Sequence, residues 1–265
     1  MLERGRVRHG PPLRPRGTDV AVAGGPVRAC EIAVCYLDRF GRQRERPVTE
    51  VGEVPFEELA PLERPVPYPG RQSFVTNAWA SATGQLLACG SLRQQRCSML
   101  LDRDPAVGLR SAGPMELRWS RQGRRHRLRP AFVALRAGRR EVICVQPEEL
   151  TGRWHCEQEV LAVAAAAASW QVRVMEPPAG VELDNLQLLY AARSPRWLTA
   201  GQDRLLARQF TSPRTIRSGV RAAALPPYAG VDLAYHLIWA QRLHTDMSVP
   251  LTPSSTAWLR PGEVT

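Results

Sequence analysis

The sequence predicts an α/β protein: a mixed α/β core followed by a mostly helical C-terminal region. The segment Glu141–Val145 is predicted to be a strand. Its pattern is apolar on both faces, so this strand should be central in a sheet. An alanine-rich stretch from about 154 to 169 is typical of a helix, and Gln171–Met175 follows as a closing strand.

Earlier segments complete this core. Glu31–Leu37 is predicted to be a strand that turns at Asp38–Arg42 into a second strand. A proline-studded connector, Pro61–Gly70, leads to a short strand at 86–89. Ser91 is a good N-cap for a helix from Leu92 to about Leu101.

The remaining core strands are predicted at Met115–Trp119 and Arg129–Leu135, with a turn at Gly138 before the central strand. The core order is therefore helix, three strands, helix, strand.

The C-terminal region carries three helix-start signals: Thr199, Ser212–Pro213 and Asp232. In the second predicted helix, Arg214, Arg217 and Arg221 recur at i, i+3 and i+7, which forms one basic face. Residues 247–259 are predicted to form a short hairpin or wing. A small winged-helix-like module fits this pattern.

These patterns divide the chain into four parts: a disordered basic arm over 1–28, a β extension and linker over 29–68, the core over 69–180, and the helical module over 181–265. The longest apolar stretch, Val160–Trp170, is too short to cross a bilayer, and no apolar segment follows the basic N-terminus. We expect a cytoplasmic protein with no membrane partner.

The formal net charge of +11 comes from arginine alone, because the chain contains no lysine. P-loop nucleotide hydrolases, protein kinases and Schiff-base enzymes all require a lysine and are therefore excluded. Planar, permanently charged guanidinium groups are suited to phosphate oxygens. A polyanion, and DNA in particular, is the expected partner.

Several blocks in the chain resemble the actinobacterial type of TnsA-like heteromeric transposase endonuclease subunit. No single block is distinctive, but their order and spacing over about 30–259 are similar to that family. The blocks are Tyr68–Phe74, Trp79–Gly84, Leu100–Pro105, Leu117–Trp119, Gly123–Arg127, Pro130–Phe132, Leu237–Trp239 and Val249–Leu251.

The resemblance implies a PD-(D/E)xK restriction-endonuclease-like core with an N-terminal β extension and a winged-helix-like C-terminal domain. Members of the family cut one DNA strand at transposon ends, alongside a partner transposase subunit and an AAA+ ATPase. Such cleavage needs carboxylates that converge on Mg²⁺, usually assisted by a lysine.

The family's charged site residues are replaced in this chain. The second glutamate of the helix motif corresponds to Gln94, and the metal-bridging aspartate to Ala131. The acidic and basic positions of the next strand fall on Cys144 and Gln146. These groups cannot supply the anionic oxygens that Mg²⁺ requires. We therefore expect a degenerate site with no bound cofactor and no enzymatic activity.

The main hypothesis is a non-catalytic subunit that binds DNA, protein partners or both within a transposase-like complex. The candidate DNA-binding residues are Arg124, Arg125, Arg127, Arg129, Arg214, Arg217 and Arg221. One alternative is an active Mg²⁺-dependent endonuclease whose acids have moved, with candidates Asp102, Asp104, Glu116, Glu141, Glu148 and Glu149. The other is a purely structural partner that does not bind DNA.

Overall fold

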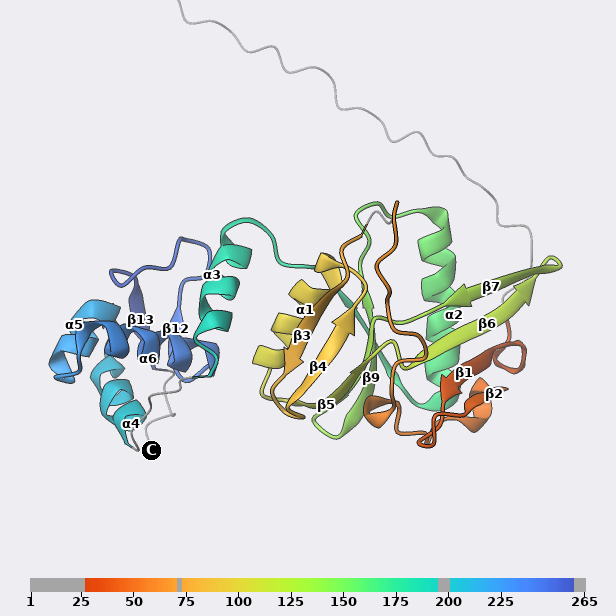
Figure 1. Ribbon diagram of the computed structural model, residues 1–265, viewed down its shortest axis with the longest axis horizontal. Coiled ribbons are helices and arrows are strands. Elements are labelled where there is room, and N and C mark those ends of the chain that lie inside the picture. Colours follow the sequence, from red (N-terminus) through yellow and green to blue (C-terminus); the bar gives the residue numbers. More distant parts are fainter. Residues whose placement is uncertain (1–26, 71–72, 195–200, 260–265) are drawn as a thin grey trace, which may run out of the picture.

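The computed structural model describes residues 27–70, 73–194 and 201–259 (Figure 1). Most of the predicted basic arm, residues 1–26, lies outside the described residues, as does the predicted helix start at Thr199. The described chain is mixed α/β, as the sequence predicted, with a sheet-rich part followed by a helical module. None of its helices is both long and apolar enough to cross a membrane.

The core sheet contains four strands in the order β10-β9-β8-β5. Its members are β5 (Val107–Ala112), β8 (Phe132–Arg136), β9 (Arg139–Val145) and β10 (Gln171–Met175). β5, β8 and β9 are antiparallel neighbours, whereas β10 runs parallel to β9 through the crossover helix α2 (Gly152–Ala168). The central position of β9, the helix α2 and the bounds of β10 confirm the predictions for this part of the chain.

One face of this sheet is covered by α1 (Leu92–Arg103) and by a two-stranded ribbon, β3 (Thr76–Ala80) and β4 (Gln85–Cys89). α1 begins where Ser91 Oγ accepts a hydrogen bond from the Gln94 amide at 3.2 Å, so the predicted N-cap is confirmed. Small and apolar side chains, among them Cys97, Leu101 and Ile143, fill the space between helix and sheet.

A second sheet lies over the other face, in the order β2-β1-β6-β7. It contains β1 (Ala33–Leu37), β2 (Gln43–Pro47), β6 (Met115–Arg121) and β7 (Arg124–Leu128). The short 3-10 turns η1 (Ala29–Glu31), η2 (Val48–Glu50) and η3 (Phe56–Glu58) flank it. The predicted β1–β2 hairpin is confirmed, and the β extension of the chain supplies part of the main core rather than lying apart from it.

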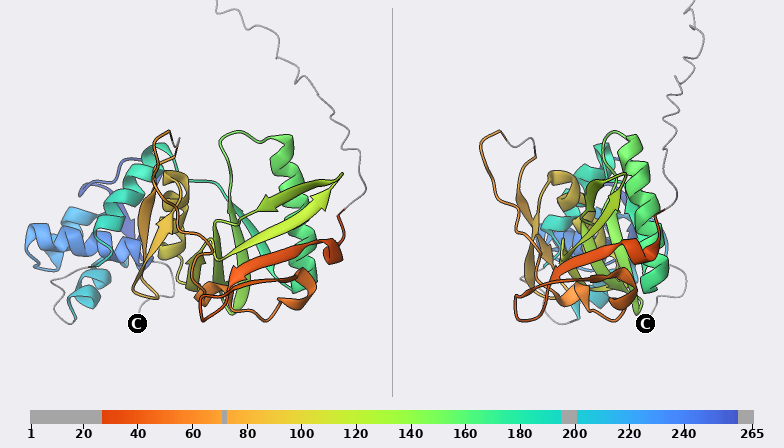
Figure 2. Two further views of the ribbon diagram at one scale, coloured as in Figure 1. Left: turned by 45° about the vertical axis from the view of Figure 1, so that its right-hand side comes forward. Right: turned by 90° about the vertical axis from the view of Figure 1, so that its right-hand side faces the viewer.

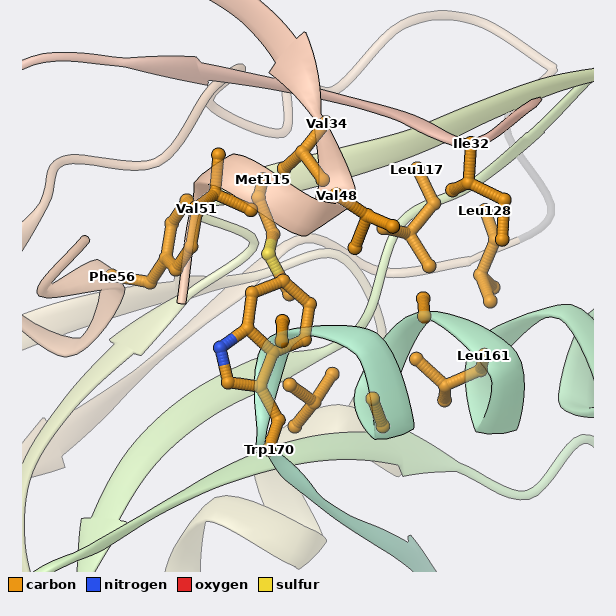
Figure 3. Packing of buried hydrophobic residues seen from close by; sticks show 14 of the residues in the cluster. Ile32, Val34, Val48, Val51, Phe56, Met115, Leu117, Leu128, Leu161 and Trp170 are labelled. Atoms are coloured by element: carbon orange, nitrogen blue, oxygen red, sulfur yellow. The ribbon is translucent and has the colours of Figure 1, made fainter. Parts of the chain in front are cut away.

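The main hydrophobic core joins this second sheet to α2 (Figure 3). Trp170, directly after α2, packs edge-on to Phe56 with ring centroids 5.6 Å apart. Met115 of β6 points inward toward Trp170, and Leu117 of β6 lies on the side of the core where α2 supplies Leu161 (Figure 3). The two sheets therefore fold as one unit, because each supplies a face of the same core.

One predicted core strand is wrong. Met115–Trp119 was expected to be the first of three core strands, but it belongs to β6 in the second sheet. The unpredicted β5 takes its place beside β8. β5 carries Arg110 and Ser111 at buried positions, so its hydrophobic pattern is broken, and only distant partners make their burial possible.

The C-terminal module has its own hydrophobic cluster. Its elements are α3 (Gly180–Ala191), α4 (Gln202–Ala207), η4 (Arg208–Phe210), β11 (Arg214–Thr215), α5 (Ile216–Ala222), α6 (Pro227–Trp239), β12 (His244–Thr245) and β13 (Thr256–Trp258). The three strands are ordered β11-β13-β12. Gly219 allows α5 to lie directly on the Phe210 ring, since a Cβ at this position would collide with it.

Two predicted helix starts in this module are wrong. Thr215, rather than Ser212, caps α5, because its Oγ1 accepts from the Ser218 amide at 3.2 Å. α6 begins at Pro227 and not at Asp232, since proline fits the first helical turn. The hairpin expected over 247–259 is confirmed in its second strand only: β13 lies in this range, but its partner β12 precedes it.

The module is joined to the core mainly at the C-terminal end of α1 (Figures 1 and 2). Met99 of α1 packs into the module's hydrophobic cluster. Arg103 Nη2 donates to the carbonyl of Ile238 at 3.2 Å, and the Trp79 amide donates to the Tyr190 hydroxyl at 3.1 Å. The C-terminal end of α1 therefore packs against the C-terminal module.

Candidate functional site: a cleft beside helix α1 and an arginine-rich sheet face

A cleft of about 440 Å³ lies between the connector and the start of α1. Gln94 and Ala131, two of the four predicted degenerate positions, both line this cleft. The other lining residues are Glu63, Arg64, Pro65, Val66, Tyr68, Ala88, Gly90, Ala112, Gly113, Arg129 and Pro130. The structure therefore brings together one helix position and one strand position that the family resemblance placed in the same site.

The side chain of Gln94 is used to hold the start of the helix. Its Oε1 accepts a hydrogen bond from the backbone amide of Gly90 at 2.6 Å. The backbone amide of Gln94 in turn donates to Ser91 Oγ. This satisfies backbone donors that the first helical turn leaves without partners. Gln94 is thus a capping residue, and its amide oxygen is already engaged.

Cys144 lies away from this cleft. Its side chain belongs to the core on the α2 side of the sheet, whereas its neighbours Ile143 and Val145 face α1. Burial raises the pKa of the Cys144 thiol to about 11, so it is a neutral core residue near neutral pH. Side chains alternate along a strand, and the register of β9 therefore separates Cys144 from Gln94 and Ala131.

Gln146 is placed beside α1 by its backbone. Its carbonyl accepts from Arg93 Nη2 at 2.7 Å and Nε at 3.2 Å, and its amide donates to the Met175 carbonyl. The contact shows that the end of β9 lies close to the first turn of α1. Of the four predicted positions, two line the cleft, one reaches the neighbouring helix turn, and one points to the opposite face.

The acids considered for a displaced metal site are mostly engaged with arginines. Asp102 forms a fully buried ion pair with Arg110 at 3.0 Å and also accepts from Ser81. Asp104 caps the end of α1 and accepts from Arg136 Nε at 3.0 Å. Among the described residues, no group of three or more His, Cys, Asp or Glu side chains is placed to hold a metal ion.

Glu116 lies between two arginines. It accepts from Arg118 Nε and Arg129 Nη2, both at 2.8 Å. Burial opposes ionisation of this carboxyl, but the two hydrogen bonds outweigh it and hold its pKa below the usual range. Glu116 is therefore an ionised structural partner.

Glu141, another of the acids considered for a displaced metal site, is buried between strands. Only 6% of the residue is exposed, and its carboxylate lies 3.7 Å from Arg173 and 3.9 Å from Arg136. The position at the start of β9 buries it between two strands that each supply an arginine. Glu148 and Glu149 are exposed.

The predicted DNA-binding arginines of the core fall into two groups. Arg124, Arg125 and Arg127 are exposed on β7 and form no ion pair with any described residue. Arg129 instead pairs with Glu63 at 3.0 Å and with Glu116 at 2.8 Å. Three of the four charges are thus open to a ligand, and the fourth is neutralised at the edge of the cleft.

The predicted basic helix face of Arg214, Arg217 and Arg221 in the C-terminal module is wrong for Arg214. Arg214 precedes the helix in β11 and pairs with Ala257 of β13, so it cannot share a helical face with the others. Arg217 and Arg221 do lie on α5, four residues apart and exposed. They border a groove between α5 and α6 that also contains Tyr228 and Asp232.

Apolar side chains at the rim of the cleft were not predicted to be functional. Val66 and Tyr68 line it and are 63% and 62% exposed, and Leu86 lines the adjoining cavity at 65% exposure. Large apolar groups gathered on a surface mark interaction sites. The signal available in the sequence was a connector whose apolar residues follow no helix or strand period.

No protein-family model matches the sequence, and no curated protein matches it at a significant level.

Proposed function

We propose that this chain is a non-catalytic, DNA-binding subunit of a transposase-like complex, built on a nuclease-like core. The order of core elements supports this proposal: helix α1, strands β5, β8 and β9, helix α2, then strand β10 parallel to β9. This is the order expected of the PD-(D/E)xK core that the family resemblance implies. The β6–β7 hairpin is inserted between β5 and β8.

The C-terminal module supports the same proposal. Helix α4, strand β11, helices α5 and α6, and strands β12 and β13 follow one another, and the three strands form a sheet in the order β11-β13-β12. A winged-helix module has this order of elements. Its α6 carries an aspartate and a histidine but no arginine, so the charges suited to phosphate lie on α5 instead.

The lack of anionic ligands in the cleft carries the non-catalytic part of the proposal. Mg²⁺ needs several hard oxygen ligands, usually carboxylates. The described lining residues offer one carboxylate, Glu63, which is paired with Arg129. Ala131 provides a methyl group, and the Gln94 oxygen is committed to the Gly90 amide. These residues do not fit a magnesium site.

The exposed arginines carry the DNA-binding part. Fluorescence anisotropy with a labelled 30-base-pair duplex should show affinity that falls steeply between low and physiological salt, because each phosphate contact releases counterions. Affinity that does not change with salt would contradict the proposal. A nicking assay on supercoiled plasmid with Mg²⁺ or Mn²⁺ should give no product, and robust metal-dependent nicking would overturn the non-catalytic assignment.

The apolar rim of the cleft favours a second candidate, a structural subunit that holds another protein of such a complex. Val66, Tyr68 and Leu86 would meet that partner with apolar surface. Stable co-elution with a transposase subunit or an AAA+ ATPase, together with no DNA binding at low salt, would favour this candidate over the first.

A further inference from the structure

The β6–β7 hairpin projects from the second sheet as a two-stranded ribbon. β1 pairs with β6 only over Met115–Arg118, so β6 and β7 continue beyond it with no third strand beside them among the described residues. Figure 1 shows the hairpin extending past α2 at one end of the molecule. With a rise of about 3.3 Å per residue, three residues and a turn reach roughly 10 Å beyond the sheet.

The ribbon carries positive charge on both faces. Residues 117–128 contain no Asp or Glu, and their arginines are Arg118, Arg121, Arg124, Arg125 and Arg127. Glu45 and Glu116 neutralise Arg118 at the base of the ribbon. Cross-strand pairing places Arg124 on the Trp119 side of the ribbon, while Arg125 and Arg127 point to the opposite side with Arg118 and Ser120. A ligand that presents phosphates on two sides of the ribbon matches this arrangement better than a flat anionic surface.

The ribbon is anchored at its base. Trp119 is only 6% exposed and stacks on His126 of the facing strand, with ring centroids 5.5 Å apart and planes inclined by 15°. Leu117 and Leu128 pair beside them in the main core. Cross-strand aromatic pairs of this kind stabilise a sheet. The exposed arginines are thus held on a preformed element rather than on a loose loop.

The tip is a two-residue turn with a polar side chain. Gln122 and Gly123 both have positive φ, +51° and +71°, which is the backbone of a type I′ turn. Asn, Asp or Gly is the usual first residue of such a turn, so glutamine adopts a backbone it disfavours. A glutamine amide can donate and accept at once, which matches the N6 and N7 edge of adenine.

The width of the ribbon can be compared with the grooves of DNA and RNA duplexes. Paired strands lie about 4.8 Å apart. The major groove of B-form DNA, about 12 Å wide, admits a two-stranded β-ribbon, whereas the minor groove is about 6 Å wide. The major groove of A-form RNA is deep and narrow and excludes side chains.

We propose that the projecting part of the β6–β7 hairpin enters the major groove of duplex DNA, with Arg124 on one side, Arg125 on the other and Arg127 at its base contacting phosphates, and Gln122 facing the base edges. This inference rests on the proposed DNA-binding function and specifies where and how the duplex is held.

The test replaces the three ribbon arginines with glutamine: Arg124→Gln, Arg125→Gln and Arg127→Gln. The matched control replaces three exposed arginines of the β1–β2 hairpin: Arg39→Gln, Arg42→Gln and Arg46→Gln. Anisotropy with a 30-base-pair duplex is measured as a function of salt. Loss of three phosphate contacts should lower the slope of log affinity against log salt by about 2 to 3.

The expected result is at least a roughly tenfold loss of duplex affinity for the ribbon variant and less than about a twofold loss for the control, with both retaining the wild-type circular dichroism spectrum. Methyl green, which occupies the major groove, should compete with the wild-type protein, whereas netropsin, which occupies the minor groove, should not. Duplex RNA of the same sequence should bind more weakly than duplex DNA.

Three outcomes would overturn the inference while the proposed function stands: equal losses in the two variants, competition by netropsin alone, or equal affinity for duplex RNA. If the wild-type protein fails to bind the duplex even at low salt, the proposed DNA-binding function itself fails. The two failures are therefore distinguishable in one set of measurements.

Discussion

The β1–β2 and β6–β7 hairpins share a sheet and are both rich in arginine, yet their charges have different environments. In the first, Arg44 Nε lies 2.9 Å from Asp38, and Glu45 accepts from Arg118 of the neighbouring strand β6. The second has no acidic residue beyond Glu116 at its base. A count of arginines therefore does not measure the charge available to a ligand; the positions of the carboxylates do.

The aromatic residues of the two hairpins also have different environments. Phe40 at the first tip is 68% exposed, with the Arg39 guanidinium 4.7 Å above its ring. Trp119 in the second hairpin is buried and fixes the ribbon to the core. Phe40 is therefore covered only by the neighbouring Arg39, whereas Trp119 belongs to the main hydrophobic core.

The largest effect should come from removing the ribbon's anchor. Trp119→Ala should lower the free energy of unfolding by about 3 to 5 kcal/mol, because it deletes a large buried side chain and its contact with His126. Phe40→Ala, the matched change in the other hairpin, should stay within about 0.5 kcal/mol. Urea denaturation followed by circular dichroism measures both. Similar losses in the two variants would show that the hairpins are anchored alike.

An intermediate effect is expected at Glu116, which binds Arg118 of the β6–β7 hairpin and Arg129 at the edge of the cleft. Glu116→Gln should lower the free energy of unfolding by about 1 to 3 kcal/mol at pH 7, because Arg118 and Arg129 lose a charged acceptor. The same change removes one negative charge, while Arg118 keeps Glu45 and Arg129 keeps Glu63, so duplex affinity should rise and its salt slope should steepen by up to about 1. Glu45→Gln, at an exposed pair, should change stability by less than about 1 kcal/mol.

The effect at Glu116 should depend on pH. Its pKa is lowered in the folded state from the usual value of 4.5, so the ionised carboxylate contributes stability above pH 4.5. That contribution is lost as the pH falls from about 4.5 through the folded-state pKa. The stability difference between wild type and Glu116→Gln should therefore shrink in acid, and a difference that stays constant from pH 7 to pH 3 would contradict the assigned role.

The smallest effect should be at the turns. Gln122→Gly relieves a positive φ at a residue with a Cβ and should raise the free energy of unfolding by up to about 1 kcal/mol. Gly41→Ala, at φ +74° in the other turn, should lower it by a similar amount. Thermal unfolding measures both variants, and a loss of stability in Gln122→Gly would mean that the glutamine side chain supports the turn.

Predictions from the sequence succeeded where a local signal decides the structure. Ser91 caps α1 and Gln171–Met175 is a strand, since capping and short apolar alternation depend on neighbouring residues. β5 was missed because the burial of Arg110 depends on Asp102 from α1. In the candidate site, Gln94 and Ala131, which the family resemblance grouped in one site, line the same cleft. The Cys144 side chain lies on the other face of the sheet, and only the register of β9 decides this.

The sequence by itself determined the kind of charge this protein carries: arginine without lysine, and a ribbon segment without a single acid. It also determined the mixed α/β class, because periodicity and capping are local properties. Only the tertiary structure decided which arginines are neutralised. Glu45, Glu63 and Glu116 meet their partners through strand pairing and chain crossing, so residues distant in sequence set the charge that remains at the surface.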